Sequence, residues 1–140
     1  MKNCIFCKLI SKEIPCYKIY EDKDIYAFLD ISPVNIGHTL VIPKKHYNTL
    51  LDCDDETLCK LIKAVKKISK AVYKSMNAEG FNIGVNTGKV AGAGYKDHLH
   101  IHIVPRWKED TNFMPVVFNT KVVSQSLNEL YGELHKRIRK

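Results

Sequence analysis

Three histidines alternate with apolar residues in one short run, His98-Leu99-His100-Ile101-His102. Because successive side chains of a β-strand point to opposite faces, this run predicts three imidazoles on one face and apolar side chains on the other. Imidazole is partly neutral near pH 7 and is a nucleophile that can form covalent phosphoryl or nucleotidyl intermediates. The run therefore predicts phosphoryl or nucleotidyl transfer, with a nucleophile, a proton donor and a positioning group side by side.

A glycine-rich loop precedes this strand and contains Gly88, Gly92 and Gly94. Glycine lets backbone N–H groups approach phosphate oxygens closely. The spacing matches neither the P-loop nor the dinucleotide-binding fingerprint. An anion-binding loop and a plain turn are therefore both open.

The pair Cys4-x-x-Cys7 has the spacing of two structural-zinc ligands and needs two more donors. By residue type, the nearest candidates are His46 and one of the three alternating histidines. A cysteine pair that simply packs and a redox motif are the alternatives. The remaining cysteines show no such pairing and are expected to be small buried hydrophobic residues: Cys16, Cys53 and Cys59.

Hydrophobic periodicity predicts five strands, over residues 16–21, 25–29, 38–43, 80–86 and 98–104. A long amphipathic helix is expected to begin after Asp54 and end before Gly80, and a second to cover 122–138. The apolar stripe predicted for the long helix consists of Leu58, Leu61, Ile62, Val65, Ile68 and Val72. This order predicts an α+β fold with a mostly antiparallel sheet, and a doubly wound sheet is the alternative.

The chain has 140 residues, of which 45% are apolar and 26% charged, so we expect a single domain over 1–140. Its net charge of +7 favours anionic partners such as phosphates and nucleotides. Nucleic acid is not expected, because the basic segment 135–140 lacks the interleaved aromatic residues of a stacking platform. No apolar run is long enough for a membrane span and the N-terminus shows no secretory signal, so we expect a cytoplasmic protein with no membrane partner.

The run 98–106, His-Leu-His-Ile-His-Ile-Val-Pro-Arg, resembles the signature of the histidine triad (HIT) family of nucleotide hydrolases and transferases. Segments 4–8, 27–33, 37–46 and 82–86 match the family in the same order, so the resemblance covers the core motifs 4–106 and leaves 107–140 as a C-terminal extension. Residues 91–94, 105–107 and 110–115 are similar to a bacterial and archaeal branch that is related to Fhit and includes diadenosine tetraphosphate phosphorylases.

The resemblance implies a homodimer that cleaves at the α-phosphate of dinucleoside polyphosphates or related nucleotidyl compounds. It implies that His100 attacks the phosphorus, and that His102 and His38 contact phosphate oxygens or the leaving group. It further implies that Asp30 accepts the ribose hydroxyls and that Asn86 and the glycine loop hold the remaining oxygens. The other residues implied in substrate binding are Gly92 and Gly94 in that loop and, in an apolar slot for the base, Ile5, Phe6, Phe28, Ile31 and Leu40.

Zinc-containing members of the family use two cysteines and two histidines, which fall here on Cys4, Cys7, His46 and His98. The resemblance thus implies a structural Zn²⁺, far from the chemistry, with all four ligands from the protein.

One departure concerns Gly94 and Tyr95, which stand where the Hint and Fhit branches have glutamine and then serine or threonine. The departure fits the phosphorylase-containing branch better, in which inorganic phosphate accepts the nucleotidyl group, and a small Gly94 would leave room for that phosphate. A purine nucleoside phosphoramidase and a nucleotide-binding regulatory dimer are the alternatives. Trp107 and the C-terminal helix are candidates for an interface or for closing over the substrate.

Overall fold

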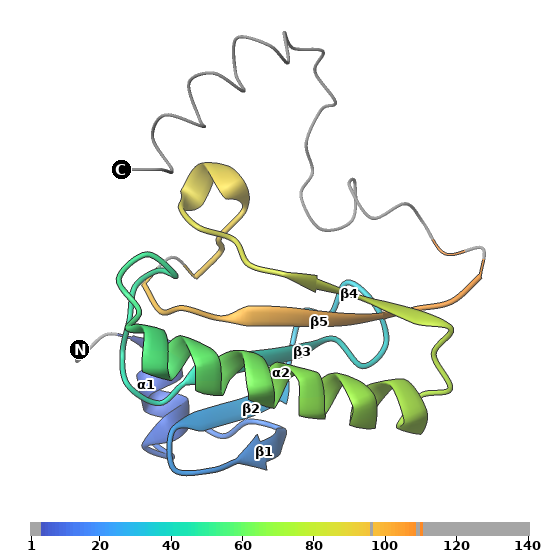
Figure 1. The fold of residues 1–140 in the computed structure, drawn as a ribbon, viewed down its shortest axis with the longest axis horizontal. Coiled ribbons are helices and arrows are strands. Elements are labelled where there is room, and N and C mark those ends of the chain that lie inside the picture. The colour runs from blue at the N-terminus through green and yellow to red at the C-terminus, as the bar shows by residue number, and fades with distance from the viewer. Residues whose placement is uncertain (1–3, 96, 109, 111–140) are drawn as a thin grey trace, which may run out of the picture.

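A computed structural model describes residues 4–95, 97–108 and 110 of the chain. Its core is a five-stranded sheet in the order β1-β2-β3-β5-β4, and every pairing is antiparallel (Figure 1). In chain order the elements are α1 (Ile5–Ile10), β1 (Lys18–Glu21), β2 (Ile25–Leu29), β3 (Thr39–Pro43), α2 (Asp55–Ser75), β4 (Gly80–Gly84), the 3-10 helix η1 (Lys89–Ala91) and β5 (Ile101–Arg106). The predicted α+β fold is confirmed and the doubly wound alternative is wrong.

The strand alternation gives the sheet two different apolar faces. Ile25 and Ala27 of β2 belong to a core with the buried stripe of α2, whereas Tyr26 and Phe28 belong to a second core with α1. Figure 1 shows α2 lying across one face of the sheet. The opposite face, next to α1, is the face on which the side chains predicted for the site lie.

The helix α2 begins where its sequence predicts. The Asp54 side chain accepts a hydrogen bond from the Thr57 N–H (2.8 Å), so it caps the first turn. Leu61, Val65 and Ile68 are buried, but Ile62 is 51% exposed, contrary to the predicted stripe. Neighbouring positions are rotated by about 100° on a helix of 3.6 residues per turn, so Ile62 lies beyond the edge of the buried stripe.

Cys59 was expected to be buried and is exposed, because it lies on the outer side of α2. Cys16 and Cys53 are partly buried. The lysines of α2 at 63, 66, 67, 70 and 74 are exposed, as expected for a solvated face.

The short helix α1 was not predicted, because it is only six residues long and includes one cysteine of the Cys-x-x-Cys pair, so its apolar periodicity cannot be recognised. Cys4 caps it, accepting from the Cys7 N–H at 3.5 Å. The helix expected over 122–138 lies outside the described residues. Within the described ranges, none of the helices has the length and apolarity needed to cross a membrane.

The strand of the triad starts later than predicted. β5 begins at Ile101, and residues 98–100 leave the ladder, with the Leu99 N–H donating to the Tyr47 carbonyl at 2.6 Å. Alternation nevertheless continues through this stretch, since Leu99 and Ile101 pack in the core under α2. The predicted alternation is therefore correct although the first two histidines precede the regular strand.

Candidate functional site

A cavity of about 650 Å³ opens between the sheet, α1 and the glycine loop. Every residue predicted for catalysis or substrate binding lines it: Ile5, Phe6, Phe28, Asp30, Ile31, His38, Leu40, Asn86, Gly92, Gly94, His100 and His102. Residues that were not predicted for catalysis or substrate binding complete the lining: Leu9, Ile14, Pro15, Cys16, Leu29, Ser32, Val34, Tyr95 and Val104. Most of these residues are apolar, and in the sequence that property alone does not distinguish a cavity wall from the core.

His100 is held as a neutral imidazole with a free lone pair. Its Nδ1 lies 2.8 Å from the carbonyl oxygen of His98 and donates to it, which leaves Nε2 unprotonated. Burial lowers the pKa of His100 from its ordinary value, so the neutral form is favoured at neutral pH. The residue therefore has the state that a nucleophile requires.

His38 and His102 form a hydrogen-bonded pair, with Nε2 of His38 2.9 Å from Nδ1 of His102. The backbone N–H of Val34 donates to Nδ1 of His38 at 3.2 Å, so the proton of His38 is on Nε2 and is donated to His102. His102 consequently carries its own proton on Nε2. Burial, aided by the neighbouring His100 and His38, lowers the pKa of His102 to about 4.

The carboxylate of Asp30 lies beside this pair, 3.6 Å from Nδ1 of His38. It also accepts from the Ser32 N–H at 2.8 Å, which shapes the turn after β2. Asp30 is the only carboxylate in the cavity lining of the described residues, and among those residues no lysine or arginine lines it.

Asn86 ties the glycine loop to β4. Its Nδ2 donates to the Ala91 carbonyl at 2.7 Å, while its buried Oδ1 has no hydrogen-bond partner within the described part of the chain. Gly92 has a φ of +83°, and a Cβ there would lie 3.0 Å from Nδ2 of Asn86. Gly94, in contrast, has open space where a Cβ would be.

Aromatic rings form one wall of the cavity. Phe6 lies 5.5 Å from Phe28, 5.1 Å from Tyr95 and 5.3 Å from His100 between ring centroids. The Tyr95 side chain thus lies against the slot rather than pointing away from it. Trp107 does not line the cavity; its Nε1 donates to the Asn77 carbonyl at 3.1 Å, beyond the end of α2.

The two cysteines and two histidines predicted as metal ligands come together. The Sγ of Cys4 lies 3.3 Å from Nδ1 of His98, and the Sγ of Cys7 lies 3.3 Å from Nδ1 of His46. One ligand atom from each of the four residues lies within 4.8 Å of the others. Four soft or borderline donors at this separation fit a tetrahedral ion.

Both histidines of this cluster are oriented by a second hydrogen bond. Nε2 of His98 donates to the Pro43 carbonyl at 2.9 Å, and Nε2 of His46 donates to Oδ1 of Asn48 at 3.1 Å. Each Nδ1 therefore keeps its lone pair for a metal.

The expectation that this cluster lies far from the chemistry is wrong. The carbonyl of His98, a cluster residue, accepts the hydrogen bond that orients His100, and Phe6 contacts the rings of both histidines. Sequence spacing could not show this, because the side chain and the carbonyl of one residue point in different directions.

Comparison with known proteins agrees with this geometry. A model of the HIT domain matches residues 11–109. The chain belongs to the HIT family. An uncharacterized HIT-like protein of Methanocaldococcus jannaschii, MJ0866, is 46% identical over 131 residues, covering 94% of this chain and 98% of that protein. Adenosine 5'-monophosphoramidase HNT1 of Saccharomyces cerevisiae is 38% identical over 135 residues, covering 96% and 80%.

Solved structures of similar proteins share the fold. SMU.412c from Streptococcus mutans superposes with a TM-score of 0.87 at 37% identity, covering 99% of this chain and 85% of that one. A Zn-bound histidine triad family protein from Mycobacterium smegmatis gives a TM-score of 0.75 at 38% identity, covering 80% and 81%.

Proposed function

We propose that this HIT protein cleaves nucleotidyl compounds at the α-phosphate through a nucleotide covalently bound to His100. The observation that carries the proposal is the neutral His100, which lines the cavity. Its Nδ1 donates to the His98 carbonyl, and its Nε2 has no hydrogen-bond partner among the described residues. Covalent catalysis of this kind divides one displacement into two easier ones.

The roles of the neighbouring side chains follow from which ring nitrogen of each histidine carries the proton. Nε2 of His100 forms a bond to the α-phosphorus as the bond to the leaving group breaks, and the Nε2 proton of His102 passes to the leaving atom. In the second half, an acceptor oxygen attacks the same phosphorus, the N–P bond breaks, and the acceptor proton returns to His102. His38 holds the His102 ring through the 2.9 Å hydrogen bond between them.

The remaining lining residues would bind the nucleoside. The Asp30 carboxylate offers acceptors for ribose hydroxyls, and the apolar wall around Phe6 and Phe28 offers a slot for a base. The glycine loop, held by Asn86, brings backbone N–H groups near the phosphate.

The leaving group that we favour is an amine, so that the substrate is a purine nucleoside 5'-phosphoramidate. The relative named adenosine 5'-monophosphoramidase supports this choice.

A second candidate is phosphorolysis of dinucleoside polyphosphates such as diadenosine tetraphosphate, with inorganic phosphate as the acceptor. The open space at Gly94, on the cavity wall, supports this candidate because a second anion could lie there. A regulatory dimer that only binds nucleotides would use the same residues and would show no turnover.

The Cys4, Cys7, His46 and His98 cluster would hold a structural Zn²⁺. The donor set and the two orienting hydrogen bonds fit this ion, and the Zn-bound relative supports it. When bound, a zinc ion with four protein ligands cross-links α1 to the segment before β5 and leaves no position for a water molecule.

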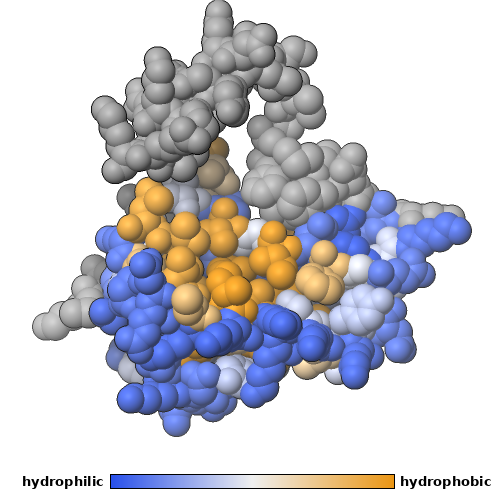
Figure 2. Space-filling view, in the orientation of Figure 1, coloured by the Kyte–Doolittle hydropathy of each residue, from blue (hydrophilic) through white to orange (hydrophobic). Residues whose placement is uncertain are grey.

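The protein is also proposed to be a homodimer. Figure 2 shows an apolar patch on the face of the molecule where α2 and β4 lie, and the exposed large apolar or aromatic side chains of these two elements are Ile62, Tyr73, Phe81 and Ile83. Among the described residues β4 is an edge strand, so its outer backbone groups could pair with those of a second subunit.

Product analysis tests the proposal. The purified protein is incubated with adenosine 5'-phosphoramidate, and with diadenosine tetraphosphate in the absence and presence of millimolar phosphate. AMP and ammonia from the amidate support the favoured candidate, and ADP with ATP formed only with phosphate supports the second. AMP and ATP in both buffers indicate hydrolysis of the polyphosphate, and no turnover of either compound would refute a catalytic role on them.

A further inference from the structure

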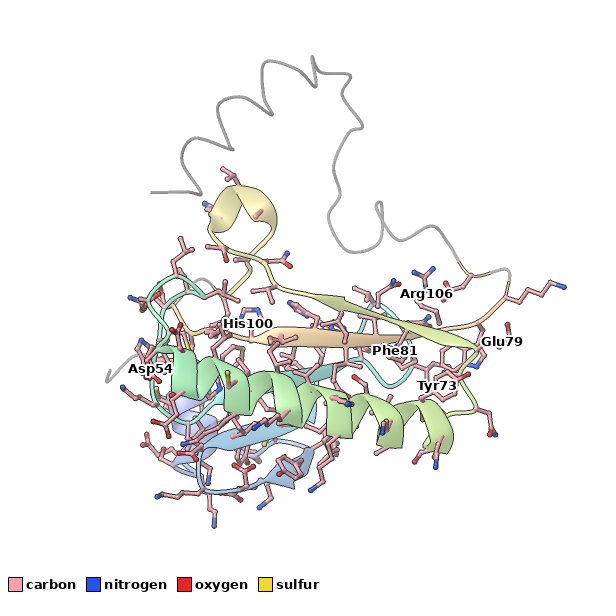
Figure 3. The ribbon with its side chains drawn as sticks, in the orientation of Figure 1. Asp54, Tyr73, Glu79, Phe81, His100 and Arg106 are labelled. Carbon is pink, nitrogen blue, oxygen red and sulfur yellow. The ribbon has the colours of Figure 1, made fainter. Side chains whose placement is uncertain are left out.

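A polar cluster lies at the end of β5 away from His100, where Arg106 is seen in Figure 3. The Asp110 carboxylate accepts from Nε of Arg106 (2.7 Å) and from Nδ2 of Asn35 (2.6 Å). The same Asn35 amide also donates to the Pro105 carbonyl at 3.0 Å. We name Asn35, Pro105, Arg106 and Asp110 the Asn35 clamp. None of these residues lines the cavity, so the clamp does not touch a substrate bound there.

The clamp holds the loop that carries His38. The backbone carbonyl of Asn35 accepts from the His38 N–H at 3.1 Å, and the preceding residue, Val34, donates its N–H to Nδ1 of His38 at 3.2 Å. Anchoring Asn35 to β5 therefore fixes the position of the Val34 N–H relative to the His38 ring. Arg106 of the clamp also donates through its guanidinium to Oδ1 of Asn82 on β4 (2.7 Å). The clamp is therefore connected to two strands of the sheet, β5 and β4.

Two groups compete for Nδ1 of His38. The Val34 N–H, at 3.2 Å, requires a lone pair on Nδ1, whereas the Asp30 carboxylate, at 3.6 Å, would accept a proton from it. In the first arrangement His38 donates through Nε2, and His102 keeps its proton on Nε2. In the second, both rings change tautomer, and Nε2 of His102 carries a lone pair in place of the proton.

We infer that the Asn35 clamp is a positioning device that selects the His38 tautomer and so keeps a proton on Nε2 of His102. The inference rests on the proposed function in one respect, since a proton at this atom matters for the leaving group. Asn35 and Asp110 act through Val34 and His38, and they are positioning residues rather than catalytic ones.

The test uses the full-length protein with ¹⁵N-labelled histidine. Long-range proton–nitrogen correlation spectra assign the tautomer of each neutral ring, and kcat and KM are measured on the substrate that wild type turns over. The variants are Asn35→Ala, Asp110→Ala and Asp110→Asn. The last keeps an oxygen acceptor for the Asn35 amide, and Lys18→Ala, which removes an exposed ion pair with Glu21, is the control for loss of a surface contact.

We expect wild type, Asp110→Asn and Lys18→Ala to show His38 protonated on Nε2. Asn35→Ala and Asp110→Ala should shift His38 toward protonation on Nδ1 and lower kcat by about tenfold or more, with KM changed by less than about twofold, because general acid catalysis contributes about 10²- to 10⁴-fold. An unchanged His38 tautomer in both alanine variants would overturn the inference, as would a wild-type His38 protonated on Nδ1. If wild type turns over no nucleotide, the proposed function fails, and the tautomers alone then decide on the clamp.

Discussion

Burial of His102 predicts a measurable acid sensitivity of the fold. The folded-state pKa of His102 is about 4, against an ordinary value of 6.5. Between these values the unfolded chain binds a proton that the folded chain does not, so the free energy of unfolding falls as the pH falls from 6.5 toward 4. A shift of about 2.5 units at about 1.36 kcal/mol per unit corresponds to a loss of about 3 kcal/mol by pH 4.

The perturbation that isolates this contribution is His102→Asn. The Asn Oδ1 can replace Nδ1 as the acceptor for the His38 Nε2–H, while the titrating group is removed. His38, His98 and His100 remain in both proteins, so their acid sensitivity cancels in the comparison except for the part that arises from their coupling to His102. The four ligands of the proposed zinc site are also unchanged.

Urea unfolding of both proteins at pH 7, 6, 5 and 4 is the assay. The free energy of unfolding of wild type minus that of His102→Asn should decrease by about 3 kcal/mol from pH 7 to pH 4, most steeply below about pH 6. A difference that stays constant with pH would refute the reasoning, because it would mean that His102 has the same pKa in the folded and unfolded chain.

Three further outcomes are expected. His100→Ala should lower kcat by about 10³-fold or more but leave equilibrium binding of AMP within about threefold of wild type, since it removes the nucleophile and not the slot; wild-type turnover in this variant would exclude a nucleotidyl–His100 intermediate. Cys4→Ser should reduce bound zinc, measured by elemental analysis, to less than half an equivalent, whereas Cys59→Ser, on the exposed side of α2, should retain it; equal zinc in both would contradict the site. Gly92→Ala should lower the free energy of unfolding by about 1 to 3 kcal/mol because of its φ of +83° and the 3.0 Å approach to Asn86, and Gly94→Ala, which meets open space, should change it by less; the reverse order would refute the assignment.

Local pattern was sufficient for most of the fold. The short apolar run of β2 and the three-and-four spacing of α2 are properties of neighbouring residues, and both elements lie where they were predicted. The same rules failed at Ile62, where the width of the buried stripe depends on what the sheet covers, and at α1, which is too short for its periodicity to be read.

The residues that the resemblance implies in catalysis and substrate binding all line the cavity. The roles assigned to them stay predictions. Two residues near the site that were not predicted are Val34, whose backbone N–H donates to His38, and Asn35, whose side chain contacts Pro105 outside the cavity. A sequence motif carries no signal for a contact made by a backbone N–H.

The sequence by itself determined which chemical groups are present and in which order: three alternating imidazoles, two paired thiols and a glycine-rich loop. Only the tertiary structure decided their protonation states. Whether His100 or His102 carries its proton on Nδ1 or Nε2 depends on whether a carbonyl or another imidazole lies beside it, and those partners come from residues 98 and 38. A tautomer is a property of the surroundings, because both ring nitrogens of an isolated imidazole can hold the proton.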